Sequence, residues 1–115
     1  MIALPALVSL PCMATAQPGQ PPFDLKDPAI VAGGRTLFNQ RCAGRCHGLD
    51  GGEGFDGPIL AGKVYLDRVY VWATLVTGRP GSAMPSWYGR LTDDEFWKII
   101  AFVSSLGDRA RGARK

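Results

Sequence analysis

The sequence is poor in side chains that bind metals, with one histidine, His47, three cysteines and three methionines among 115 residues. A structural zinc site normally needs four ligands. Cys42, Cys46 and His47 have no second cluster of such residues to complete a set of four. The alternation of polar and apolar residues that marks β-strands is also missing, and so are internal repeats. These absences disfavour a zinc-built domain and predict an all-α fold.

Signatures of hydrolases and nucleotide-binding proteins are missing as well. Gly51-Gly52-Glu53-Gly54 is a weak glycine pattern with no strand before it and no lysine after it. The net charge of +3 resides in residues 108–115, which hold four basic side chains and one acidic one. We expect this tail to be solvated and disordered. Because no basic face with interleaved aromatic residues accompanies it, nucleic acid is not an expected partner.

The first sixteen residues carry no charge and are mostly apolar. They end in Ala14-Thr15-Ala16, a small-x-small site typical of a cleaved secretory signal, and are short for a membrane span. We expect cleavage after Ala16 and a periplasmic location, with Cys12 in the discarded signal. No lysine or arginine precedes the apolar run, which suggests that the natural start lies upstream or that the signal is clipped. An uncleaved N-terminal anchor is the alternative.

The rest of the chain divides into a Pro/Gly-rich linker at 17–27, one small domain at 28–107 and the basic tail at 108–115. Asp27 and Pro28 predict a helix start, as N-cap and first helical residue. The pair Gly33-Gly34 inside this helix would need a gain such as close helix packing, or else the helix starts after Gly34.

Two further helices and one loop are predicted in the domain. A helix is expected at Tyr65–Gly78, with its apolar face formed by Val69, Trp72, Ala73 and Val76 and widened by Val71 and Leu75. Residues 48–62 are rich in glycine and predict a loop. The last helix is expected to begin at a Thr92–Glu95 capping box and to end at Gly107. Its apolar stripe consists of Phe96, Ile99, Ile100, Val103 and Leu106.

The segment CAGRCH contains two cysteines and a histidine directly after the second one. This order suggests covalent haem attachment, although the usual spacer between the cysteines is two residues and here it is three. A small domain gains from such a staple. A Cys42–Cys46 disulfide is the alternative, but it would close a loop too short to add much stability.

A haem iron bound by histidine commonly takes a methionine thioether on its other side. Met84 is the one methionine that remains after removal of the signal, and it lies 37 residues beyond His47. It belongs to the loop SAMPSW, where Pro85 fixes the backbone just after it. The alternative is that Met84 fills space in the core.

Four stretches together resemble a class I cytochrome c. They are GRTLFNQRCAGRCHG (34–48), GPILAG (57–62), SAMPSW (82–87) and DDEFWKIIAFVSSL (93–106). The resemblance implies a cytochrome c-like helical bundle around one covalently bound haem c. It also implies that the first and last helices cross where a glycine, Gly33 or Gly34, meets an aromatic residue, Phe96 or Trp97.

By the same resemblance, Cys42 and Cys46 form the haem thioethers, and His47 and Met84 are the axial iron ligands. The backbone carbonyl of Pro58 would orient His47. The chain departs from the family in its spacer, Ala43-Gly44-Arg45. Either both thiols are bonded and the extra residue bulges at Gly44, which we favour, or only Cys46 is bonded and Cys42 is spare.

We therefore expect a periplasmic carrier of single electrons rather than an enzyme, with redox proteins and no small-molecule substrate as partners. The resemblance suggests a periplasmic dehydrogenase as donor and an oxidase or another cytochrome as acceptor. Docking is expected at a haem edge ringed by Ala43, Gly44, Pro80, Gly81 and Pro85. The alternative is a catalytic or ligand-binding haem protein with an open sixth iron position, for which Arg79 and Tyr88 are the available distal side chains.

Overall fold

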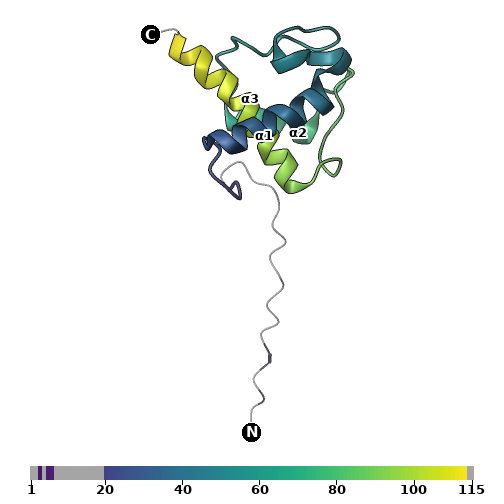
Figure 1. The fold of residues 1–115 in the computed structure, drawn as a ribbon. Helices are drawn as coiled ribbons and strands as arrows, with labels where there is room; N and C mark the ends of the chain where they lie inside the picture. The colour runs from purple at the N-terminus through teal and green to yellow at the C-terminus, as the bar shows by residue number, and fades with distance from the viewer. Residues whose placement is uncertain (1–2, 4, 7–19, 114–115) are drawn as a thin grey trace.

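The computed structural model describes residues 3, 5–6 and 20–113. Cys12 and the predicted cleavage site after Ala16 lie outside the described residues. Three helices, α1 (Pro28–Phe38), α2 (Arg68–Thr77) and α3 (Asp93–Ala113), form the body together with the shorter helical segments η1 (Asn39–His47) and η2 (Leu49–Gly51) (Figure 1). The described residues include no strand, so the all-α prediction is confirmed. In this part of the chain, no helix is long and apolar enough to cross a membrane.

Helix α1 begins as predicted, because the Asp27 side chain accepts a hydrogen bond from the Ala29 amide at 2.9 Å. It runs straight through Gly33 and Gly34, so the alternative start after Gly34 is wrong. A Cβ on Gly34 would lie 1.8 Å from the Lys98 carbonyl oxygen of α3. The predicted close crossing of the first and last helices is therefore present, and Gly34 makes it possible.

The partner of Gly34 at this crossing differs from the prediction. The atoms that a Cβ on Gly34 would meet belong to the Lys98 backbone and the Phe102 side chain, not to Phe96 or Trp97. Those two aromatic side chains are instead buried in the core, with exposed fractions of 4% and 0%. The predicted helices cross, and a glycine does meet an aromatic residue there, but that residue is Phe102.

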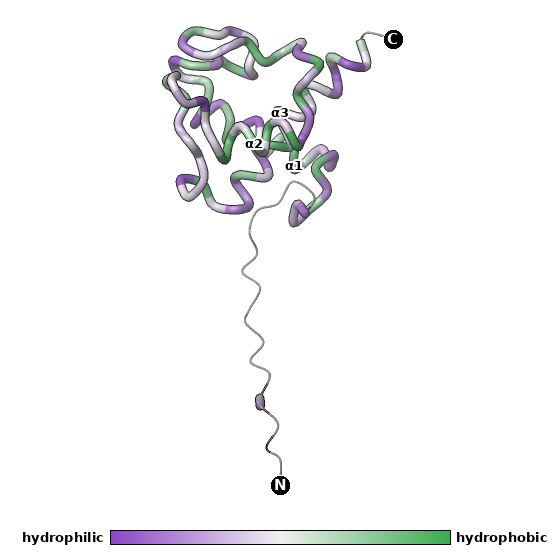
Figure 2. Tube along the Cα trace, turned by 180° about the vertical axis from the view of Figure 1, so that it is seen from behind, coloured by the Kyte–Doolittle hydropathy of each residue, from purple (hydrophilic) through white to green (hydrophobic). Residues whose placement is uncertain are grey.

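Helix α3 supplies most of the hydrophobic core. Its N-terminus carries the predicted capping box, in which Glu95 Oε1 accepts from the Thr92 amide and Thr92 Oγ1 accepts from the Glu95 amide. All five residues of the predicted stripe are buried. Hydrophobic residues gather where the three helices meet (Figure 2). The buried core side chains are Phe38, Leu66, Val71, Leu75, Phe96, Trp97, Ile99, Ile100, Phe102, Val103 and Leu106.

Helix α2 is shorter and rotated relative to the prediction. It begins at Arg68, capped by Asp67, rather than at Tyr65, and Gly78 ends it as expected. Val71 and Leu75 are its buried residues, whereas Val69, placed on the predicted face, is 55% exposed. Because apolar residues surround much of this helix, the sequence did not define which side faces the core.

Gly107 does not end helix α3, which continues to Ala113 and projects from the body (Figure 1). A Cβ on Gly107 would lie 1.7 Å from the Leu66 carbonyl oxygen, so this glycine permits a close approach rather than a helix stop. Beyond it, the Arg111 guanidinium donates to the Val64 and Leu66 carbonyl oxygens at 2.7 and 3.1 Å. Residues 108–113 of the predicted disordered tail are therefore helical.

Candidate haem site

The extra residue between the cysteines lies in a widened helical turn. Segment η1 follows α1 directly and has the i→i+5 pattern of a π-helix, which is how a helix accommodates one inserted residue. Within it, Gly44 departs from helical geometry, with φ 8° and ψ −114°. The Gly48 amide donates to the Ala43 carbonyl oxygen at 2.9 Å across this point. The backbone thus bends at Gly44, where the sequence predicted a bulge.

The imidazole of His47 is nearly buried and held on several sides. Its Nδ1 donates to the Pro58 carbonyl oxygen at 2.8 Å. The Phe38 ring of α1 lies 6.1 Å from the imidazole, centroid to centroid. A Cβ on Gly57 would lie 2.9 Å from His47 Cε1, so the loop backbone also packs against the ring. Because a carbonyl can only accept, Nδ1 carries the proton and Nε2 keeps a lone pair for a metal.

The loop before Pro58 also fixes the backbone of the second cysteine. The amides of Phe55 and Gly57 both donate to the Cys46 carbonyl oxygen, at 2.8 and 3.1 Å. The Asp56 amide donates to the Arg45 carbonyl oxygen at 2.9 Å. The residues after Gly44 are therefore anchored to the glycine-rich loop, while the residues before Gly44 continue from α1.

A cavity of about 500 Å³ brings the predicted site residues together. Its volume lies within the range of about 300–1,000 Å³ typical of ligand and cofactor pockets. The predicted residues that line it are Cys42, Cys46, His47, Pro58 and Met84. Its walls also include apolar core side chains from α2, α3 and the loop before α2, namely Leu66, Val71, Leu75, Ile99 and Val103. An apolar enclosure with two thiols, an imidazole and a thioether fits the donor set and surroundings of a haem c.

The loop that carries Met84 is tied to the end of α2. The Arg79 amide donates to the Met84 carbonyl oxygen at 3.1 Å, and the Met84 amide donates to Ser82 Oγ at 3.2 Å. Gly78 has φ +65°, and a Cβ there would lie 2.6 Å from the Pro85 carbonyl carbon. Met84 therefore lies in a loop whose path depends on a glycine, as its proline- and glycine-rich sequence indicated.

No disulfide joins Cys42 to Cys46. Burial, and then the neighbouring Cys46, raise the pKa of the Cys42 thiol to about 12, while the positive charge of Arg41 acts in the opposite direction. Within the described part of the chain, no three His, Cys, Asp or Glu side chains are placed to hold a metal ion. The geometry therefore offers no ligand set for the zinc alternative there.

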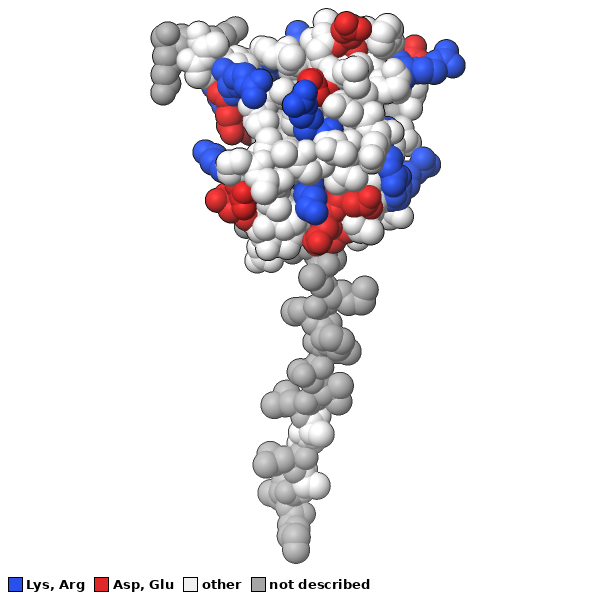
Figure 3. Space-filling view, in the orientation of Figure 1, with Lys and Arg blue, Asp and Glu red and all other residues white. Residues whose placement is uncertain are grey.

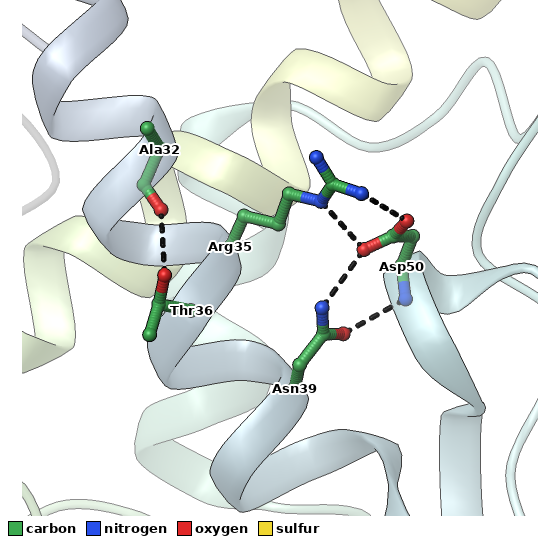
Figure 4. A network of polar contacts seen from close by, with 5 residues as sticks. All are labelled: Ala32, Arg35, Thr36, Asn39 and Asp50. Atoms are coloured by element: carbon green, nitrogen blue, oxygen red, sulfur yellow. Dashed lines mark hydrogen bonds and ion pairs between the residues drawn. The ribbon is translucent and has the colours of Figure 1, made fainter.

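Sequence reasoning did not find a polar network beside the site (Figure 4). The Arg35 guanidinium forms a two-point contact with the Asp50 carboxylate, with both hydrogen bonds at 2.7 Å. Asn39 Nδ2 donates to Asp50 Oδ1 at 2.9 Å, and Asn39 Oδ1 accepts from the Asp50 amide at 2.8 Å. The contact with Arg35, and then that with Asn39, lower the pKa of Asp50 to about 2. Asp50 also adopts φ 57°, the one positive φ outside glycine among the described residues.

A second pair that the sequence did not predict lies at the cavity wall. The Arg79 guanidinium donates to the Tyr70 hydroxyl and lies 5.5 Å from the centre of the Tyr70 ring. Both residues line the cavity. Tyr88, considered as a distal side chain, is 59% exposed and is not among the lining residues.

The predicted docking edge needs one correction. Ala43 is 3% exposed, because the turn folds it inward, so its side chain is not available to a partner. Gly44, Pro80 and Gly81 are exposed, and Pro85 is half-buried. Basic and acidic side chains are interspersed over the face seen in Figure 3, with no extended area of one sign.

Comparison with known proteins identifies relatives over most of this region. Residues 29–103 match the family described as "Cytochrome C oxidase, cbb3-type, subunit III". The Cbb3-type cytochrome c oxidase subunit CcoP of Cereibacter sphaeroides is 37% identical, over 70% of this chain and 29% of that protein. Cytochrome c55X of Paracoccus denitrificans is 42% identical, over 53% of this chain and 59% of that protein. The chain thus spans under a third of the length of that CcoP subunit.

A solved structure gives the same result for the fold. Cytochrome CL of the marine methylotrophic bacterium Methylophaga aminisulfidivorans aligns with a TM-score of 0.61 at 28% identity, covering 73% of this chain and 62% of that one. The helical bundle, the cavity and the sequence matches all indicate the same family. The chain belongs to the cytochrome c family, matching the cbb3-type oxidase subunit III domain, and this family implies covalently bound haem c and electron transfer.

Proposed function

We propose that this protein carries single electrons on one covalent haem c, with His47 and Met84 as axial ligands and Cys42 and Cys46 as thioethers. The observation that carries the proposal is the shared cavity, which is lined by all four side chains. Each thiol would add its S–H across one vinyl double bond of the macrocycle, forming one S–C and one C–H bond without net oxidation. The iron would supply reversible one-electron chemistry.

The residues around the cavity have distinct tasks in this proposal. The Pro58 carbonyl holds His47 in the tautomer that presents Nε2 to the cavity. Apolar side chains of α2 and α3 exclude water, and a methionine thioether opposite histidine raises the reduction potential. Because Met84 would occupy the sixth position of the iron, a carrier role is favoured over a catalytic one.

The proposed partners are redox proteins. Two of the relatives named above are a cytochrome c and a subunit of a cytochrome c oxidase, which supports an oxidase or another cytochrome as acceptor. A periplasmic dehydrogenase remains the proposed donor, and an exported location the proposed compartment. Because charges of both signs are interspersed on the face seen in Figure 3, docking through that face should depend only modestly on salt.

Purified protein matured by a c-type assembly system tests this function. We expect one haem per chain by intact mass, a six-coordinate low-spin spectrum and a reversible one-electron redox titration. Protein that folds and is exported but binds no haem would overturn the proposal. A high-spin spectrum that responds to added ligands would favour the open sixth position instead.

A further inference from the structure

The widened turn consists of two halves that are held by different parts of the molecule. Before Gly44, the segment with Cys42 continues from helix α1. After Gly44, the Cys46 carbonyl is bound by the amides of Phe55 and Gly57, and His47 is bound by Pro58. Gly44 is exposed, and beyond its chain neighbours nothing lies within 4 Å of where its Cβ would be, so among local contacts the Gly48 amide to Ala43 carbonyl hydrogen bond is the one that crosses the bend. The position of Cys42 relative to Cys46 therefore depends on what spans this bend.

Besides that backbone bond, the side chains of the Arg35–Asn39–Asp50 network span it. Arg35 and Asn39 belong to the first half, at the end of α1 and the start of η1, whereas Asp50 follows the second half (Figure 4). The contacts between Asn39 and Asp50 close residues 39–50 into a ring that contains both cysteines and the histidine. A non-glycine residue at positive φ persists only where its surroundings hold it, and Asp50 is such a residue.

We infer that Arg35, Asn39 and Asp50 are positioning residues that keep the Cys42 thiol beside the cavity despite the three-residue spacer. The inference rests on the proposed haem function. Arg35 is exposed, and Asn39 and Asp50 are polar and only half-buried, so the role of the network is geometric rather than a contribution to the hydrophobic core. With the two-point contact between Arg35 and Asp50 and both contacts of Asn39 in place, the bend at Gly44 has one preferred angle. Without them, the half with Cys46 and His47 keeps its own anchors, while Cys42 can move away.

The test compares haem attachment in wild type, Asp50→Ala and Asn39→Ala, each matured with the same assembly system. The readouts are the pyridine haemochrome maximum, which distinguishes one thioether from two, and titration of free thiols. We expect both variants to retain haem through Cys46 and His47 but to show a several-fold higher ratio of singly to doubly attached protein. Each singly attached molecule should release one free thiol, assigned to Cys42 by peptide mass.

Two controls separate positioning from loss of stability. Arg111→Gln removes an arginine–aspartate pair within α3 and the hydrogen bonds from Arg111 to the Val64 and Leu66 carbonyl oxygens, so it should lower stability without changing the attachment ratio. Deletion of Gly44 restores a two-residue spacer, and in that background Asp50→Ala should leave both thioethers intact. Doubly attached haem in Asp50→Ala and Asn39→Ala at the wild-type ratio would overturn the inference. Wild-type protein without haem would instead overturn the proposed function.

Discussion

The two ring nitrogens of His47 have different surroundings, and this difference assigns its chemistry. Nδ1 is bound to the Pro58 carbonyl, whereas the ring borders the cavity that Met84 also lines. The sequence predicted directly that His47 is the histidine ligand of the iron, because it is the single histidine and follows a cysteine. The role of Pro58 came from family resemblance alone, since no local pattern indicates which carbonyl an imidazole will meet eleven residues away.

Replacement of Met84 by leucine tests the sixth ligand. Leucine keeps the apolar volume but has no sulfur, so we expect loss of the six-coordinate low-spin spectrum and a lower reduction potential. Redox titration with visible spectroscopy measures both changes. Tyr88→Phe is the control, because Tyr88 is exposed and away from the cavity. An unchanged spectrum in Met84→Leu would contradict methionine ligation.

The polar network shows what single-residue reasoning missed. Arg35 and Asp50 are fifteen positions apart, and each alone is typical of an exposed charged residue. Only the return of the chain after His47 brings them together. Because this return depends on the widened turn and on positive φ at several residues, composition and periodicity carried no signal for it.

Alanine should have opposite effects on stability at the two adjacent glycines of helix α1. Gly34→Ala would place a methyl group against the Lys98 carbonyl, and such overpacking typically costs about 1–3 kcal/mol. At Gly33 a Cβ would lie 3.7 Å from the flexible Lys98 side chain, so Gly33→Ala should gain up to about 1 kcal/mol of helix propensity. Thermal unfolding of both variants measures the difference. Equal midpoints would contradict the close crossing.

The turn after α2 offers a second matched pair. Gly78 and Gly81 both have positive φ, but a Cβ on Gly78 would meet Pro85 and Ser86, whereas a Cβ on Gly81 would meet nothing within 4 Å. Alanine strains both backbones, and only Gly78→Ala should also displace the Met84 loop. We expect weakened methionine ligation in the near-infrared spectrum of Gly78→Ala and an intact signal in Gly81→Ala. The same loss in both would assign the effect to backbone strain.

Elements were predicted with uneven success, for identifiable reasons. The capping box and the strict apolar stripe defined the start and inner face of α3. Gly107 was misread because a glycine that admits a neighbouring backbone has the same signature as one that ends a helix. The face of α2 was misassigned because Val69, Val71, Trp72 and Leu75 give two competing stripes.

The stability of the whole molecule should fall at acid pH because the Asp50 carboxylate becomes protonated. Its pKa is lowered from 3.8 to about 2 in the folded state. A lowered folded-state pKa stabilises the protein fully above the unfolded value, and this contribution disappears as the pH falls from about 4 towards 2. We expect Asp50→Asn to be less stable than wild type at neutral pH and to lose less stability over that acid interval.

Chemical denaturation at a series of pH values measures this difference. Glu53→Gln is the control, because it removes one negative charge from the same loop without breaking a hydrogen bond or ion pair found among the described residues. Parallel acid profiles for wild type and Asp50→Asn would contradict the assigned role of the carboxylate.

We propose a molecule built around one haem that is attached through both cysteines. A pyridine haemochrome spectrum paired with intact mass tests it most directly, on protein matured by a c-type assembly system. We expect one haem per chain and a two-thioether spectrum with no free thiol at Cys42 or Cys46. A red-shifted, single-thioether spectrum with one free thiol would contradict attachment at Cys42, and a chain without haem would contradict the claim as a whole.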